Sequence, residues 1–195
     1  MTKKLANKIA TYLCNRNGFG KEDFDVYEYG IEVILCNNIP LIVMLIIGIV
    51  TGTLLQSIIF SCVFRFVRTQ CGGYHAETST MCFIITIGCY LMVLALSFLD
   101  FRFIRYLNLI IFLTCEVIFG LFAPVDSPNK HVEEEKKNIF RMRTLIIVGI
   151  LYVISVLLYS YNRAASNSIV FTIAIIAVFL LIQYERRKRY EKGIC

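Results

Sequence analysis

One short polar segment, residues 65–82, holds the residue types that could carry chemistry in this chain. It reads RFVRTQCGGYHAETSTMC and lies between two strongly apolar stretches. It contains His75, one of only two histidines, and Cys82 stands seven residues later. A pair of arginines and a pair of glycines precede the histidine: Arg65, Arg68, Gly72 and Gly73. A cysteine with a histidine is the minimal set for nucleophilic acyl chemistry, so this segment is the candidate active site.

The spacing of the histidine and the cysteine sets a geometric condition on that chemistry. The thiolate is the attacking form of cysteine, and a histidine with nearby arginine charges stabilises it. On one continuous helix, the Cα atoms of His75 and Cys82 would be about 10.5 Å apart, which is too far for contact. We therefore predict a break within 76–81, with Cys82 opening the next helix, where the helix dipole also favours a thiolate. Gly72-Gly73 would let the chain fold back and could supply N–H groups to an oxyanion.

The same residues also have simpler explanations. A cysteine at the edge of an apolar stretch is most often a small packing residue, and a histidine in a polar loop is most often solvated. Cys71 lies in the same segment and is the rival thiol. A small membrane transporter or scaffold without catalysis is the alternative function, although transporters usually show internal repeats and none is evident here.

The elements that must position this segment are apolar helices. Of the 195 residues, 57% are hydrophobic and only 17% are charged, whereas soluble domains carry about 25% charged residues. Apolar segments follow one another at roughly 31–52, 53–67, 82–99, 104–122, 145–161 and 168–183. We therefore predict an all-α, polytopic membrane protein with about six transmembrane or membrane-embedded helices. The short second segment also fits a half-span or a re-entrant piece, and four crossings with buried hairpins is the alternative.

The whole chain is expected to form a single domain with three regions: an N-terminal amphipathic region at 1–28, a membrane core at 31–183 and a basic tail at 184–195. Near the N-terminus, apolar residues recur at helical spacing between lysines, at Leu5, Ile9 and Leu13. This pattern predicts a basic amphipathic helix on the cytoplasmic leaflet. A solvated helix with a small packing face is an equally open alternative.

The basic residues predict an orientation. With six crossings and the N-terminus inside, 17 of the 20 basic residues are cytoplasmic, and the outside keeps only Arg102, Arg105 and Arg163. This asymmetry is the positive-inside pattern of membrane proteins. It predicts that both termini, the segment 65–81 and the loop 123–144 lie on the cytoplasmic side.

Several other classes of function are not supported. The net charge of +6 comes from residues that flank apolar segments, so membrane topology explains it better than nucleic-acid binding. The eight cysteines are scattered and include no C-x-x-C pair, which argues against a disulfide framework. No histidine, cysteine or carboxylate pattern has metal-ligand spacing, and no cofactor motif is present.

The candidate segment resembles the signature of the accessory gene regulator B (AgrB) family, bacterial membrane cysteine endopeptidases that process quorum-sensing peptide precursors. That signature has an arginine, Gly-Gly-x-His-Ala and a cysteine seven residues after the histidine, and this chain has Arg68, Gly72-Gly73-Tyr74-His75-Ala76 and Cys82. The length, the basic N-terminal region and the loop at 123–127 also fit, so the resemblance covers essentially the whole chain. Family members often carry a proline before the cysteine, whereas this chain has Glu77-Thr78-Ser79.

The resemblance implies roles and a reaction. Cys82 would be the nucleophile, His75 the base and acid, and Arg68, Gly72 and Gly73 supporting residues. Weaker candidates for substrate contact are Arg65, Thr78 and Lys130. The enzyme would cut the C-terminal tail from a short amphipathic precursor through an acyl-enzyme thioester, leading to a cyclic thiolactone or lactone. Its expected location is the bacterial cell membrane, and its expected partners are the precursor and the lipid bilayer, with homodimerisation left open and no nucleic acid or cofactor.

Overall fold

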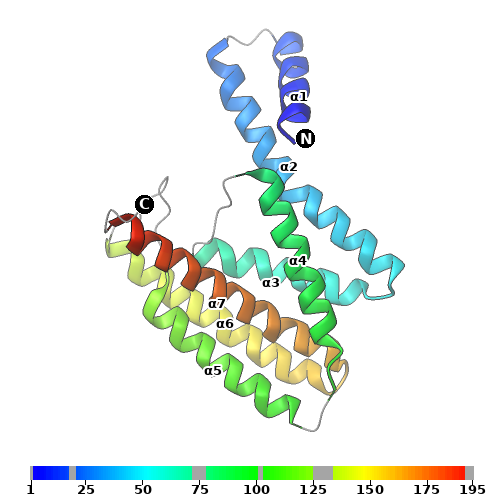
Figure 1. Cartoon of the computed structure of the whole chain (residues 1–195), viewed down its shortest axis with the longest axis vertical. Helices are drawn as coiled ribbons and strands as arrows, with labels where there is room; N and C mark the ends of the chain where they lie inside the picture. Colours follow the sequence, from blue (N-terminus) through cyan, green and yellow to red (C-terminus); the bar gives the residue numbers. More distant parts are fainter. Residues whose placement is uncertain (1, 18–20, 72–77, 101–102, 125–133, 192–195) are drawn as a thin grey trace.

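The structure, a computed structural model, describes residues 2–17, 21–71, 78–100, 103–124 and 134–191. Within these ranges the regular elements are all α-helices, arranged as an elongated bundle (Figure 1). In chain order they are α1 (Thr2–Asn17), α2 (Lys21–Val50), α3 (Leu54–Cys71), α4 (Ser79–Ser97), α5 (Ile104–Phe122), α6 (Glu134–Tyr159) and α7 (Arg163–Glu191). Each of the six predicted apolar segments corresponds to one of the helices α2 to α7.

Five helices are long and apolar enough to cross a membrane by length and composition: α2, α4, α5, α6 and α7. The protein is therefore a polytopic helical membrane protein, as predicted. The segment 53–67 forms the sixth helix, α3, which has 18 residues. At 1.5 Å per residue α3 is about 27 Å long, close to the hydrocarbon thickness of about 30 Å. It is a continuous helix, but it is not among the five candidate spans, so whether it crosses the bilayer fully stays open.

Helix α1 and the first half of α2 form a hairpin that stands out from the bundle, whereas the second half of α2 packs on α3 and α4 (Figure 1). Ala6 and Ala10 of α1 are fully buried, and α1 packs on α2. The Asn7 side-chain amide donates a hydrogen bond of 3.1 Å to Glu28. Leu5, which we expected on the apolar face, is 46% exposed. Helix α1 therefore packs on α2 through its alanine face, and whether its leucine and isoleucine stripe lies on the cytoplasmic leaflet stays a prediction.

Helix α2 continues through Pro40, and α3 supplies a partner for its backbone. Proline lacks an N–H group, so the carbonyl oxygen four residues before it, that of Cys36, loses its helical donor. The Arg65 guanidinium of α3 donates a hydrogen bond to the carbonyl oxygen of Asn37. This contact joins the middle of α2 to the last turns of α3.

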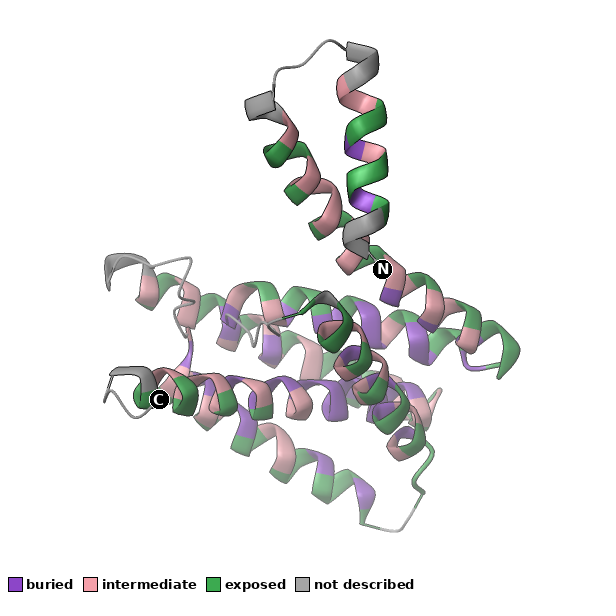
Figure 2. Cartoon of the chain, turned by 45° about the horizontal axis from the view of Figure 1, so that its top comes forward, coloured by how far each residue is buried: buried purple, intermediate pink, exposed green. Residues whose placement is uncertain are grey.

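Helix α7 lies at the centre of the bundle and packs on α3, α4, α5 and α6. In its most apolar stretch 67% of the residues are buried, against 17–22% in the other four candidate spans. Figure 2 shows this as a long run of buried residues along α7, and residues 165–173 are all buried. The small side chains in this run, such as Ala165 and Ser168, allow neighbouring helices to approach closely.

One residue of α7 fixes the corner at which α4 ends. The Asn167 side-chain amide donates to the carbonyl oxygens of Ser97 (3.0 Å) and Leu99 (3.2 Å). Its side-chain oxygen accepts a hydrogen bond of 2.8 Å from Asn108 of α5. Because the last carbonyl groups of a helix lack intrahelical partners, this buried amide both caps α4 and joins three helices.

Consecutive long helices run in opposite directions, so the end of one helix lies beside the start of the next (Figure 1). At that end Arg141 of α6 donates to the carbonyl oxygen of Ala123 (2.9 Å), just after α5. At the opposite end Arg163 of α7 forms an ion pair with Asp100, which follows α4. The end of α3, the start of α4 and the C-terminal part of α7 therefore share the end that carries most of the basic residues.

Candidate functional site

The predicted break within 76–81 is present at Thr78, but Cys82 does not open the next helix as predicted, because that helix begins three residues earlier. Helix α3 ends at Cys71 and α4 begins at Ser79, with Thr78 as its N-cap in extended conformation (φ −129°, ψ 144°). The Thr78 hydroxyl accepts a hydrogen bond from the Met81 N–H at 3.3 Å. A threonine cap satisfies an N–H group that the first turn leaves without a partner, so the helix can start here without a proline. Thr78, predicted as a weak substrate contact, has this structural role, and its contact with substrate stays a prediction.

Cys82 lies at the end of the first turn of α4 and is partly exposed. Its N–H donates to the Thr78 carbonyl oxygen at 3.1 Å, and its own carbonyl oxygen accepts from the Thr86 hydroxyl at 2.8 Å. The N-terminal turn of a helix carries a partial positive charge that favours an anion. The local backbone therefore holds Cys82 in the first turn of α4, at the positive end of the helix dipole.

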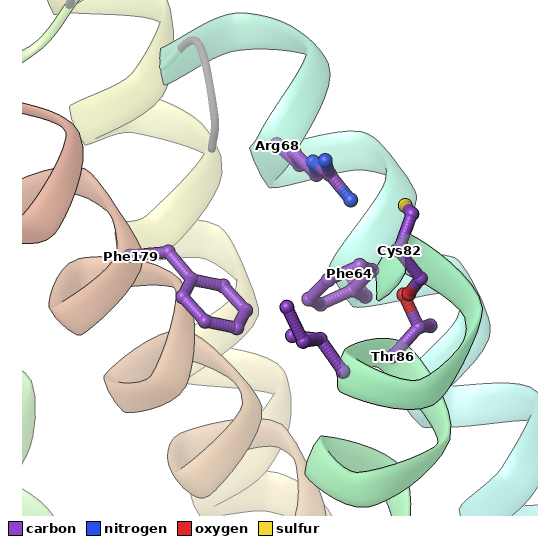
Figure 3. A pocket seen from close by; sticks show the side chains of 6 residues that line it. Phe64, Arg68, Cys82, Thr86 and Phe179 are labelled. Atoms are coloured by element: carbon purple, nitrogen blue, oxygen red, sulfur yellow. The ribbon is translucent and has the colours of Figure 1, made fainter. Parts of the chain in front are cut away.

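Three helices bring Cys82 and Arg68 into one small hollow (Figure 3). The hollow is shallow and open to solvent, and its lining residues are Phe64, Arg68, Cys82, Ile85, Thr86 and Phe179. The Arg68 guanidinium lies over the Phe64 ring, 5.5 Å from the ring centroid. Arg68 and Cys82, both predicted site residues, thus face a common space.

The rival thiol in the same segment, Cys71, is in a different environment. It ends α3, beyond the apolar stretch 53–67, and is fully buried. Burial raises the pKa of the Cys71 thiol to about 12, although the Arg68 charge and a backbone hydrogen bond oppose the shift. A thiol that stays protonated at neutral pH is a poor nucleophile. Cys82 is therefore the better candidate of the two.

A second cysteine that shares a cavity with an arginine is Cys62, which the sequence argument did not single out. Cys62 is exposed and lines a groove of about 620 Å³ between α2 and α3. The other lining residues are Leu41, Ser61, Arg65, Phe66 and Thr69. Here the Arg65 guanidinium contacts the Asn37 carbonyl oxygen. Cys62 also lies in the middle of its helix, so it lacks the helix-terminal position of Cys82.

Several predicted site residues lie outside the described part of the chain: Gly72, Gly73, His75 and Lys130. The pairing of His75 with Cys82, the glycine N–H groups and the Lys130 contact therefore stay predictions. The hollow also contains residues that the sequence argument missed. Thr86 and Phe64 lie four residues from Cys82 and Arg68, a helical spacing that could have identified them. Phe179 comes from a distant part of the sequence and could be found only from the packing of α7.

The fold and the hollow define a polytopic helical membrane protein with a cysteine and an arginine facing a small cavity at one end of the bundle. The accessory gene regulator B (AgrB) family profile matches residues 6–182. The chain therefore belongs to this family, which takes part in accessory gene regulator quorum sensing.

Relatives from three genera agree with this assignment. The chain is 29% identical to an AgrB-like protein of Clostridium perfringens strain 13, over 85% of this chain and 82% of the relative. It is 30% identical to an AgrB-like protein of Listeria monocytogenes strain HCC23, over 75% and 74% of the two chains. It is 28% identical to the accessory gene regulator protein B of Staphylococcus aureus strain MW2, over 76% and 79%. No solved structure matches the chain significantly.

Proposed function

We propose that this protein is a membrane cysteine endopeptidase that removes the C-terminal tail of a short peptide precursor, with Cys82 as nucleophile. The observation that carries the proposal is that Cys82 and Arg68, two residues of the family signature, face the same hollow. The helix-terminal position of Cys82 and its partial exposure support the same role. The precursor and the lipid bilayer are the proposed partners.

The reaction proceeds in two acyl transfers. The Cys82 thiolate attacks the carbonyl carbon that precedes the tail, the C–N bond breaks, and the leaving amine takes a proton from the His75 imidazolium. The remaining peptide is held on Cys82 as a thioester. An internal cysteine or serine of the precursor then gives a proton to neutral His75 and attacks the thioester. The bond to Cys82 breaks and a cyclic thiolactone or lactone leaves.

The surroundings of Cys82 suit this sequence of steps. A thioester conserves much of the activation of the acyl group, so ring closure needs no ATP. It also hydrolyses if water competes with the internal nucleophile. The positive guanidinium of Arg68, held over the Phe64 ring, is placed to stabilise the oxyanion that forms during attack.

The experiment that tests this function compares three cysteines. Purified protein in lipid vesicles is incubated with a synthetic precursor taken from the neighbouring reading frame, and the released tail is measured by mass spectrometry. Cys82→Ala should reduce tail release below detection, because the thioester can no longer form. Cys62→Ala and Cys71→Ala are matched controls and should retain it.

Tail release by Cys82→Ala would overturn the mechanism. If Cys62→Ala is inactive while Cys82→Ala is active, the catalytic thiol lies in the groove between α2 and α3 instead. The same samples give a thermal unfolding curve, which separates loss of the nucleophile from loss of the fold.

A further inference from the structure

The groove between α2 and α3 lies on the face of α3 that points away from Cys82. One residue of α2 and five of α3 line it: Leu41, Ser61, Cys62, Arg65, Phe66 and Thr69. Phe66 is two positions from both Phe64 and Arg68, which line the hollow, and two positions correspond to about 200° around a helix. The groove and the hollow therefore lie on opposite faces of α3, so a substrate held at Cys82 would not fill the groove.

The groove offers mainly carbon surface to a ligand. Its cavity volume is about 330 Å³, and about 620 Å³ when the open side is counted, which reaches the range of roughly 300–1,000 Å³ typical of ligand sites. The Ser61 hydroxyl donates to the carbonyl oxygen of Ser57 at 2.8 Å. The Thr69 hydroxyl likewise donates to the carbonyl oxygen of Phe66 at 2.8 Å. Both hydroxyl hydrogens are thus used within α3 and are not offered to a ligand.

The apolar surface continues beyond the groove along α3. Leu55 and Ile58 are 47% and 44% exposed, and with Cys62 they follow the three- and four-residue spacing of a single helix face. From Leu55 to Arg65 the helix rises about 15 Å. Because the hydrocarbon core is about 30 Å thick, one leaflet is about 15 Å deep. The exposed face of α3 is therefore long enough for one acyl chain of one leaflet.

Arg65 supplies the one charge among the residues that line the groove. Its guanidinium donates to the carbonyl oxygen of Asn37, a neutral acceptor, and has five N–H donors in all. Within the described ranges, no carboxylate forms an ion pair with Arg65. An arginine beside a membrane helix is costly without a partner, and its planar fork fits the oxygens of a phosphate group.

We propose that this groove binds one anionic phospholipid of the surrounding bilayer, with the phosphate on Arg65 and an acyl chain along Leu41, Phe66 and the exposed face of α3. A single cation at one end of a long carbon surface matches the charge and the shape of such a lipid. A soluble phosphate would leave the carbon surface uncovered. An extended peptide would bring backbone N–H and C=O groups that carbon walls cannot pair. The proposal does not depend on the peptidase.

Cys62 tests the proposal, because it is an exposed thiol in the groove and a bound lipid would cover it. The purified protein in detergent micelles is titrated with phosphatidylglycerol, or with phosphatidylcholine that has the same acyl chains. Peptide mass spectrometry gives the rate at which iodoacetamide alkylates Cys62, and this rate is divided by that of Cys82 on the opposite face. Phosphatidylglycerol should protect Cys62 at about fivefold lower mole fraction, the effect of about one basic residue at an anionic surface. Inorganic phosphate should give no protection.

Three variants separate the charge from the carbon surface. Arg65→Gln should abolish the preference for phosphatidylglycerol, because the groove then holds no charge. Arg143→Gln is the matched control: it removes an exposed arginine of α6 outside the groove and should leave the preference intact. Phe66→Ala keeps the charge but shortens the apolar wall, so more phosphatidylglycerol should be needed for the same protection. Phe66 is 66% exposed, so this variant should fold even if Arg65→Gln does not, and unfolding midpoints check all three.

Equal protection by the two lipids in the wild-type protein would overturn the proposal, whatever the variants do. A preference that Arg65→Gln retains, or that Arg143→Gln also loses, would show that the overall charge and not the groove selects the lipid. An unchanged titration of Phe66→Ala would remove the acyl chain from the groove. Protection by inorganic phosphate alone, or by a synthetic precursor peptide and not by lipid, would assign the groove to a different ligand and would equally overturn the proposal.

Discussion

At the scale of single residues, the surroundings decide which cysteine can react. Cys71 and Cys82 belong to the same short segment, and both are close to Arg68. Full burial raises the pKa of the Cys71 thiol to about 12, whereas Cys82 lines an open hollow at a helix start. The motif alone does not separate the two thiols, but their positions on α3 and α4 do.

The predicted pairing of His75 with Cys82 can be tested through the rate at which iodoacetamide alkylates Cys82. His75→Ala should slow that reaction at pH 6.5 by about tenfold, which corresponds to about 1.4 kcal/mol of lost thiolate stabilisation. The variant should never react faster than the wild-type protein. The difference in rate should vanish towards pH 10, where thiols ionise without help. Peptide mass spectrometry gives the rates.

His131→Ala is the matched control for that measurement, because it removes the other histidine of the chain. It should leave the alkylation rate of Cys82 unchanged at every pH. Equal rates for wild-type protein and His75→Ala at pH 6.5 would show that the two residues do not form a pair.

At the scale of elements, the turn between α2 and α3 determines how closely these helices approach. Gly52 has a φ of +69°, a left-handed conformation that glycine adopts without steric cost. Just before it, Gly48 packs directly on Ser57 of α3: a Cβ atom added at Gly48 would lie 2.2 Å from the Ser57 hydroxyl oxygen. That hydroxyl bonds to Tyr90, whose ring meets Phe60 edge-on, so the close approach of α2 and α3 supports the packing of α3 on α4.

Gly48→Ala should therefore destabilise the protein by about 1–3 kcal/mol, the usual cost of overpacking a close contact. The measurement is the unfolding midpoint in detergent, followed by the alkylation rate of Cys82. Gly120→Ala is the matched control, because nothing lies within 4 Å of a Cβ atom at Gly120. If both variants unfold at the wild-type midpoint, α2 and α3 do not approach each other as closely as described.

At the scale of the whole molecule, α7 organises the bundle around the candidate site. Its first half is buried among α3, α4, α5 and α6 and caps the end of α4 through Asn167. Its second half brings Phe179 to the hollow. The helices alternate in direction, so the hollow lies at the end of the bundle where the basic residues gather. The positive-inside rule then predicts that this end is cytoplasmic.

Single-cysteine labelling in intact cells tests that orientation, in a background without the native cysteines. A membrane-impermeant maleimide should label cysteines introduced at Phe103 and Tyr161, which are 64% and 92% exposed. It should label those at Gly20, His75, Glu135 and Tyr190 only after the membrane is permeabilised. Labelling at His75 in intact cells would contradict the orientation and would separate the site from a cytoplasmic precursor.

Local patterns in the sequence determined the class of protein and the position of its candidate site. Runs of apolar residues predict membrane helices because the bilayer requires each span to satisfy its own backbone hydrogen bonds. The distance between His75 and Cys82 predicts a helix break because the rise of a helix is fixed. These inferences depend on neighbouring residues only, and the structure confirms the six apolar helices and the break before Cys82, although α4 begins at Ser79 rather than at Cys82.

Only the tertiary structure decided which helix is central and what surrounds Cys82. The apolar segment of α7 resembles the others in composition, and its burial depends on how four other helices pack on it. The burial of Cys71, the contact of Arg65 with α2 and the place of Phe179 beside Cys82 have the same origin. Each depends on contacts between segments far apart in the chain. Hydropathy and spacing along one segment do not indicate which distant side chain will pack beside that segment.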